Sequence, residues 1–102
     1  FNRDGAAFDK GETFSGVPFD VALEAVEALR PLVPEGATMA AFALRWCLME
    51  DAVTVVIPGA RSPAQSRANA AADALAPLPD ATMVAAREVY RRLIAPHVDH
   101  LW

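Results

Sequence analysis

The chain reads Val53-Thr-Val-Val-Ile-Pro-Gly-Ala-Arg-Ser-Pro-Ala-Gln-Ser-Arg-Ala-Asn69 near its middle. The four β-branched residues from Val53 to Val56, followed by Ile57, favour a short strand covered on both faces, because parallel strands buried under helices lack the alternation of half-exposed ones. Pro58 and Gly59 then end the run with a turn. The residue types therefore predict a strand over 52–58 that is followed directly by a helix.

The predicted helix has a clear start signal and a candidate anion site. Ser62 can serve as the N-cap, Pro63 suits the first helical position, and Gln65 lies three residues after the cap. The first amide groups of a helix lack partners within it, and the helix dipole favours an anion there. Arg61 adds a planar fork of donors at the same place. The turn and the helix start that follows it therefore predict a phosphate-binding site.

Several segments resemble the aldo-keto reductases. The run Val56–Gln65, with Asn69 four residues later, resembles the last strand and the cofactor-clamping helix of that family. Ala37–Met49 is similar to the helix that precedes this strand, and Ala74–Leu78 to the link before the C-terminal helix. Tyr90–Trp102 resembles the closing segment of some members. The resemblance covers nearly the whole chain.

The resemblance implies the α/β class, with this chain as the C-terminal fragment of a (β/α)8 TIM barrel. The 102 residues are then mostly helical and contain one strand. A loop is expected over 1–18, helices over 19–50, the last barrel strand over 52–58 and helices over 62–95. All 102 residues belong to the same C-terminal part of the barrel.

Sequence signals also predict where the helices begin and end. Asp20, Thr38 and Ser62 are candidate N-caps, because each side chain can accept a hydrogen bond from a free backbone amide. The second helix is apolar nearly all round, which predicts burial on several sides. The last helix is expected over 80–94, with Pro96 ending it.

A cofactor site is implied by the resemblance. NADP(H) would deliver a hydride to a small-molecule carbonyl substrate. The backbone of Gly59 and Ala60 would border the adenosine phosphates, Arg61 and Gln65 would meet the 2′-phosphate or the adenine, and Asn69 would reach the adenine edge. The predicted cofactor-binding residues are Gly59, Ala60, Arg61, Ser62, Gln65 and Asn69.

Two of these residues have an alternative structural role. Gln65 can instead be used in a capping box at the helix start. Asn69 can be a solvated residue on the outer face of the helix. Ala68 stands where many family members have a glutamate, which removes one expected adenine contact.

No catalytic residue and no metal site are predicted in this chain. Family members use a tyrosine, a lysine, an aspartate and a histidine that the earlier part of the barrel supplies. Tyr90, the only tyrosine, has the helical spacing of a packing residue, and Lys10 lies in the expected loop. His97 and His100 lack a further acid or cysteine at ligand spacing.

Composition excludes several classes of partner. Nine Lys and Arg residues against thirteen Asp and Glu give a net charge of −4, which does not suit a nucleic-acid-binding surface. No apolar run is long enough for a membrane span. Cys47 is the single cysteine, so an internal disulfide is excluded and a cytoplasmic location is expected. The first residue is Phe1, from which we expect a truncated or processed piece of a longer protein.

These observations predict the C-terminal, cofactor-clamping portion of an NADPH-dependent aldo-keto reductase. The alternatives are a non-catalytic helical interaction module and a small anion-binding module without a redox role. A single strand needs backbone partners on both sides. The isolated fragment is therefore expected to self-associate or to need the rest of the barrel.

Overall fold

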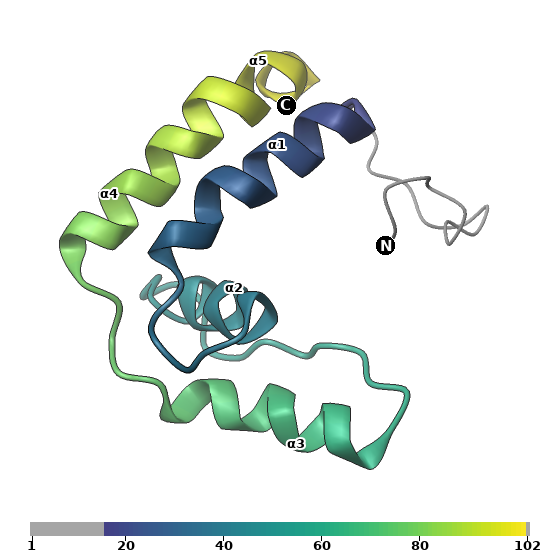
Figure 1. Cartoon of the computed structure of the whole chain (residues 1–102), viewed down its shortest axis with the longest axis vertical. Coiled ribbons are helices and arrows are strands. Elements are labelled where there is room, and N and C mark those ends of the chain that lie inside the picture. Colours follow the sequence, from purple (N-terminus) through teal and green to yellow (C-terminus); the bar gives the residue numbers. More distant parts are fainter. Residues whose placement is uncertain (1–15, 102) are drawn as a thin grey trace. The chain divides into compact units, whose positions relative to one another are not determined.

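The computed structural model describes residues 16–101 as a series of helices joined by turns and links. The order is α1 (Phe19–Leu29), η1 (Arg30–Leu32), α2 (Met39–Cys47), α3 (Pro63–Ala71), η2 (Ala72–Ala74), α4 (Asp80–Val89), the π-helix η3 (Tyr90–Ile94), α5 (Ala95–Val98) and η4 (Asp99–Leu101) (Figure 1). The chain divides into two compact units. One comprises residues 32–84, and the other combines the chain before residue 32 with the chain after residue 84.

The strand expected over 52–58 does not form in the part of the chain that the structure describes. Residues 53–60 instead run from α2 to α3 as an extended link (Figure 1). Val53 N donates to Glu50 O at 2.9 Å, but no described residue forms a backbone hydrogen bond with Thr54–Pro58. Within this link, Val55 is 64% and Ile57 is 89% exposed. The prediction was wrong because a strand needs a neighbouring backbone, which no described segment supplies.

Of the N-caps predicted for α1 and α2, the structure confirms the one at α2. Thr38 Oγ1 accepts a hydrogen bond from Ala41 N at 3.1 Å, which confirms Thr38 as the N-cap of α2. The prediction for Asp20 was wrong, because Pro18 occupies the cap position of α1 and makes no side-chain hydrogen bond there. Asp20 lies in the first turn, where its negative charge still interacts favourably with the positive end of the helix dipole.

The core of the unit formed by residues 32–84 lies between α2 and the segment that leads into the first turns of α4. Phe42, Leu78 and Met83 are its buried members, and partly buried apolar side chains pack around them. Leu78 N also donates to the sulfur of Met49 at 3.4 Å. The second helix also packs on α3 and η2. Because α2 is buried on one face in this core and also packs on α3, the core fixes the position of α3, the helix that follows the link.

In the other unit, α1 packs against η3, and α5 packs against the same π-helix (Figure 1). The helix expected to end at Pro96 continues through it into α5. A proline has no backbone N–H and its ring collides with the carbonyl four residues earlier in an α-helix. The wider π-turn of η3 immediately precedes this proline, and such turns accompany kinks in helices. The prediction that Pro96 stops the helix was therefore wrong.

Tyr90 was expected to be a packing residue, but it is 44% exposed. Its hydroxyl donates a hydrogen bond to Asp99 Oδ1 at 2.5 Å. The pKa of Tyr90 is raised above its usual value, chiefly by this hydrogen bond, and further by desolvation and by the negative charge of Asp99. The hydrogen bond thus links the start of η3 to the start of η4.

Because the folded-state pKa of Tyr90 is raised, the hydrogen bond stabilises the fold below the usual tyrosine pKa and is lost as the pH rises through the raised value. Tyr90 is the only tyrosine in residues 1–102, so tyrosinate absorbance in an alkaline titration of this isolated chain reports this side chain alone. We expect Asp99→Ala to lower the midpoint, whereas Glu88→Ala, at an exposed ion pair on the same helical run, should leave it unchanged. A midpoint that Asp99→Ala does not lower would contradict the hydrogen bond.

Candidate functional site

The predicted N-cap organises the turn between the link and α3, residues 59–65, which we call the corner. Ser62 has an extended backbone, with φ −148° and ψ 156°, and its Oγ accepts a hydrogen bond from Gln65 N at 3.2 Å. Its carbonyl accepts from Ser66 N at 3.0 Å, and Pro63 opens the helix. The sequence signal for this helix start is thus confirmed. The cap also uses Gln65 N, one of the amides that an anion would otherwise meet.

The side chain of Gln65 takes part in the same corner. Its Oε1 accepts a hydrogen bond from Arg61 N at 2.6 Å, one residue before the cap. This is a capping interaction displaced by one position from the usual box. The side-chain oxygen of Gln65 is therefore used by the backbone of Arg61, and only the Nε2 group of this side chain remains for a ligand. The bond also fixes the backbone from which the Arg61 side chain extends.

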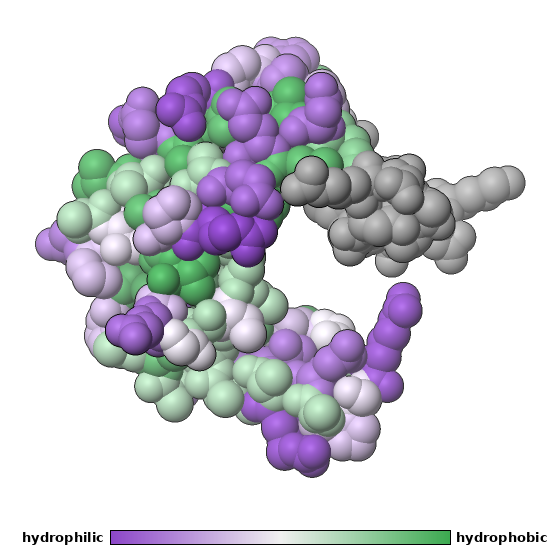
Figure 2. Space-filling model, viewed as in Figure 1, coloured by the Kyte–Doolittle hydropathy of each residue, from purple (hydrophilic) through white to green (hydrophobic). Residues whose placement is uncertain are grey.

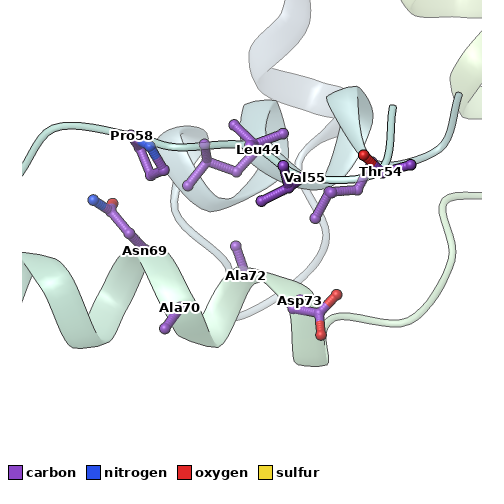
Figure 3. A pocket seen from close by; sticks show the side chains of 10 residues that line it. Leu44, Thr54, Val55, Pro58, Asn69, Ala70, Ala72 and Asp73 are labelled. Carbon is purple, nitrogen blue, oxygen red and sulfur yellow. The ribbon is translucent and has the colours of Figure 1, made fainter. Parts of the chain in front are cut away.

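Asn69 fastens the turn of the link to α3. Its Nδ2 donates to Gly59 O at 3.1 Å, and the residue is half-buried. Figure 3 shows Asn69 directed from α3 toward the link near Pro58. Asn69 is therefore not simply a solvated residue on the outer face. One of its donors holds Gly59 in place, while its Oδ1 is not engaged by any described residue.

An open pocket brings these residues together. It is lined by Ala40, Gly59, Ala60, Arg61, Gln65 and Asn69. All the predicted site residues except Ser62 thus line one pocket, and Ser62 supports it as the cap. Ala40 was missed by the sequence reasoning. It lies in the first turn of α2, and its sequence neighbourhood gives no sign of which part of that helix faces the corner.

The one charged residue among the described residues that line the pocket is Arg61. None of its lining residues is acidic, and Arg61 is exposed. Among residues 16–101, no carboxylate forms an ion pair with the Arg61 guanidinium. Since Gln65 N is used by the cap and Pro63 has no backbone N–H, an anion would depend mainly on Arg61 and on the helix dipole.

A second, mainly apolar hollow of about 290 Å³ lies between α2, the link and α3 with η2. Figure 3 shows Leu44 of α2 and Ala72 of η2 on its two sides, with Val55 on the link. Asn69 borders this hollow as well as the pocket at the corner. The link therefore rests loosely on the helices and is not closely packed against them.

Other residues singled out in the sequence do not assemble into sites. Within residues 16–101, no group of three or more His, Cys, Asp and Glu side chains is arranged to hold a metal ion. Cys47 is a free, half-buried thiol. No helix of the described chain is both long and apolar enough to cross a membrane. Lys10 lies outside the described residues.

Comparison with known proteins bears on most of the chain. A model of the Aldo/keto reductase family matches residues 2–91, which include α2, the link and α3. No match was found among curated proteins or among solved structures. Because the family model covers most of the sequence and includes the corner described above, the chain belongs to the aldo/keto reductase family.

Proposed function

We propose that this chain is the C-terminal, cofactor-clamping portion of an NADPH-dependent aldo-keto reductase. The observation that carries the proposal is the acid-free pocket in which the link, α3 and Ala40 of α2 meet around Arg61. An unpaired guanidinium at a helix start suits a phosphate, because it offers two parallel donors to the phosphate oxygens. NADPH has such a phosphate on its adenosine ribose.

The residues present fit the adenosine end of this cofactor. A side chain at Gly59 would meet no heavy atom within 4 Å, so a ligand can approach its backbone closely. We assign the 2′-phosphate to Arg61 and the other adenosine phosphates to the backbone of Gly59 and Ala60. The Oδ1 of Asn69 and the Nε2 of Gln65 remain to receive the adenine edge. The bound cofactor would supply the hydride for reduction of a carbonyl.

We further propose that the link occupies the place of the last strand in a (β/α)8 barrel. Its unpaired backbone and its exposed side chains Val55 and Ile57 suit a position between two strands from elsewhere in the protein. Two buried donors on α2, Arg45 Nε and Trp46 Nε1, also lack acceptors among the described residues. Buried donors are nearly always satisfied in complete folds. The catalytic groups and the carbonyl substrate then belong to the rest of the barrel, and we place the protein in the cytoplasm.

The test compares the intact protein with the isolated chain of residues 1–102. The intact protein is expected to oxidise NADPH when an aldehyde or ketone is added, whereas the isolated chain is expected to be inactive, because it lacks the family's proton donor and its supporting groups. Absorbance of the nicotinamide measures both. Activity of the isolated chain that disappears in its Arg61→Ala variant would contradict this division, since activity from a contaminant would survive that substitution. An intact protein that binds NADPH but reduces no carbonyl would favour the anion-binding module.

The isolated chain is also expected to associate into dimers or larger species. Apolar side chains reach the surface in several places on the face seen in Figure 2, and the extended backbone of the link at Thr54–Pro58 has no backbone hydrogen-bond partner among residues 16–101. Exposed apolar patches and free edges both promote association. Light scattering measures the mass. Ile57→Lys should reduce association, and Val84→Lys, an exposed position on α4, should have a smaller effect. A monodisperse monomer with a cooperative melt would contradict this prediction.

A further inference from the structure

The chain just before α1 is held by the end of α5 and by η4. Gly16 has a φ of +95°, a backbone conformation that side chains other than glycine rarely adopt. A Cβ built on Gly16 would lie 3.1 Å from Leu101 Cδ1, 3.3 Å from Val98 Cγ1 and 3.6 Å from His97 O. These two segments are therefore packed together at a point that only a glycine fits without displacement.

A side-chain hydrogen bond holds the same C-terminal segment to the start of η3. Tyr90 begins the π-helix and Asp99 begins η4, so the bond of 2.5 Å between them spans the π-turn and Pro96. Asp99 directly follows Val98 and lies two residues before Leu101, the two side chains that approach Gly16 most closely. The hydrogen bond and the packing at Gly16 thus act on the same short piece of chain.

We propose that residues 95–101 form a strap that clamps the start of α1, and that the hydrogen bond between Tyr90 and Asp99 is the latch that keeps the strap closed. In the closed state, Val98 and Leu101 lie against Gly16. When the latch opens, the strap and the chain at Gly16–Val17 lose the same packing contact. The two segments therefore open together, although they lie at opposite ends of the described chain.

The free energy needed to open the strap is small. Chain ends and short helices are held by few contacts, so their local opening costs much less than global unfolding. A single hydrogen bond is then a large part of what keeps the strap closed. Pro96 in the first turn of α5 limits the conformations of the open strap, so the strap returns readily to the closed state. The closed strap and the open strap are thus separated by a small number of identifiable contacts.

Hydrogen exchange of the intact protein, followed by mass spectrometry, tests the proposal. Tyr90→Phe keeps the ring and removes the donor. We expect exchange to become roughly three- to tenfold faster both at residues 97–101 and at Val17 with the first turn of α1. Asp99→Asn keeps an acceptor oxygen and should have a smaller effect. Arg92→Gln, at an exposed position in the same π-helix, is the control and should change neither segment.

A second variant approaches the strap from the other side. Gly16→Ala places a methyl group against Leu101 and Val98 and disfavours the φ of +95°. Faster exchange at residues 97–101 in this variant supports the clamp. Faster exchange in only one of the two segments, or unchanged exchange in both variants, would overturn the proposal. If Tyr90→Phe does not fold, the response of residues 97–101 to Gly16→Ala decides the question alone.

Discussion

Under the proposed function, replacing Arg61 by alanine in the intact protein is expected to weaken NADPH binding by roughly ten- to a hundredfold and to change NADH binding by less than about threefold. The reason is that the guanidinium lines the pocket without a carboxylate partner among the described residues, so its donors are free for the 2′-phosphate that only NADPH carries. Fluorescence titration with each cofactor measures the two affinities.

The substitution leaves the local fold intact, because the backbone N–H of residue 61 still reaches Gln65 and Ser62 still caps α3. Arg67→Ala is the matched control. Arg67 is an exposed arginine on the same helix but does not line the pocket, and its removal should have little effect on either cofactor. If Arg61→Ala weakens both cofactors equally, Arg61 serves the shared part of the dinucleotide or the fold. The assignment of the 2′-phosphate to Arg61 would then be wrong.

The sequence was most informative where structure depends on neighbours within a few residues. The caps at Thr38 and Ser62 and the start of α3 at Pro63 follow from side chains that bond to amides three residues away. The same local logic predicted that Gln65 could bond to the backbone. It did not show that the partner is Arg61 N, because this choice depends on the detailed path of the turn.

Long-range features could not be obtained in this way. The apolar run in the link has the composition of a buried strand, but the described structure contains no backbone beside it, so composition alone did not decide its state. The contribution of Ala40 depends on how α2 rotates when Phe42 enters the core, which no spacing within the link or α3 encodes. The bond between Asn69 and Gly59 joins residues ten apart across a turn and was likewise missed.

The end of the chain shows a local rule that was outweighed by its context. Proline usually ends a helix, but the π-helix η3 precedes Pro96 and the chain continues into α5. Helical spacing placed Tyr90 with the packing residues. The wider turn begins at Tyr90, so the α-helical period no longer applies there, and its hydroxyl reaches Asp99. A period of 3.6 residues predicts a face only while the helix remains regular.

Phe42→Ala is expected to lower the free energy of unfolding of the intact protein by about 3–5 kcal/mol. Phe42 is only 3% exposed and packs with Leu78 and Met83 in the core that joins α2 to the start of α4. Alanine would leave a cavity that these neighbours fill only in part. Urea denaturation measures the effect, which should appear as a lower midpoint with an unchanged slope.

Val84→Ala provides the control for the Phe42 variant, because it also removes apolar atoms but from a side chain that is 63% exposed on α4. Its effect should stay within about 0.5 kcal/mol. The Phe42 variant also tests the site, since α2 carries both Phe42 in the core and Ala40 in the pocket. A ligand that binds only the folded protein stabilises it by mass action. Added NADPH should therefore raise the midpoint of both variants, and equal midpoints for Phe42→Ala and Val84→Ala would show that α2 is not anchored by Phe42.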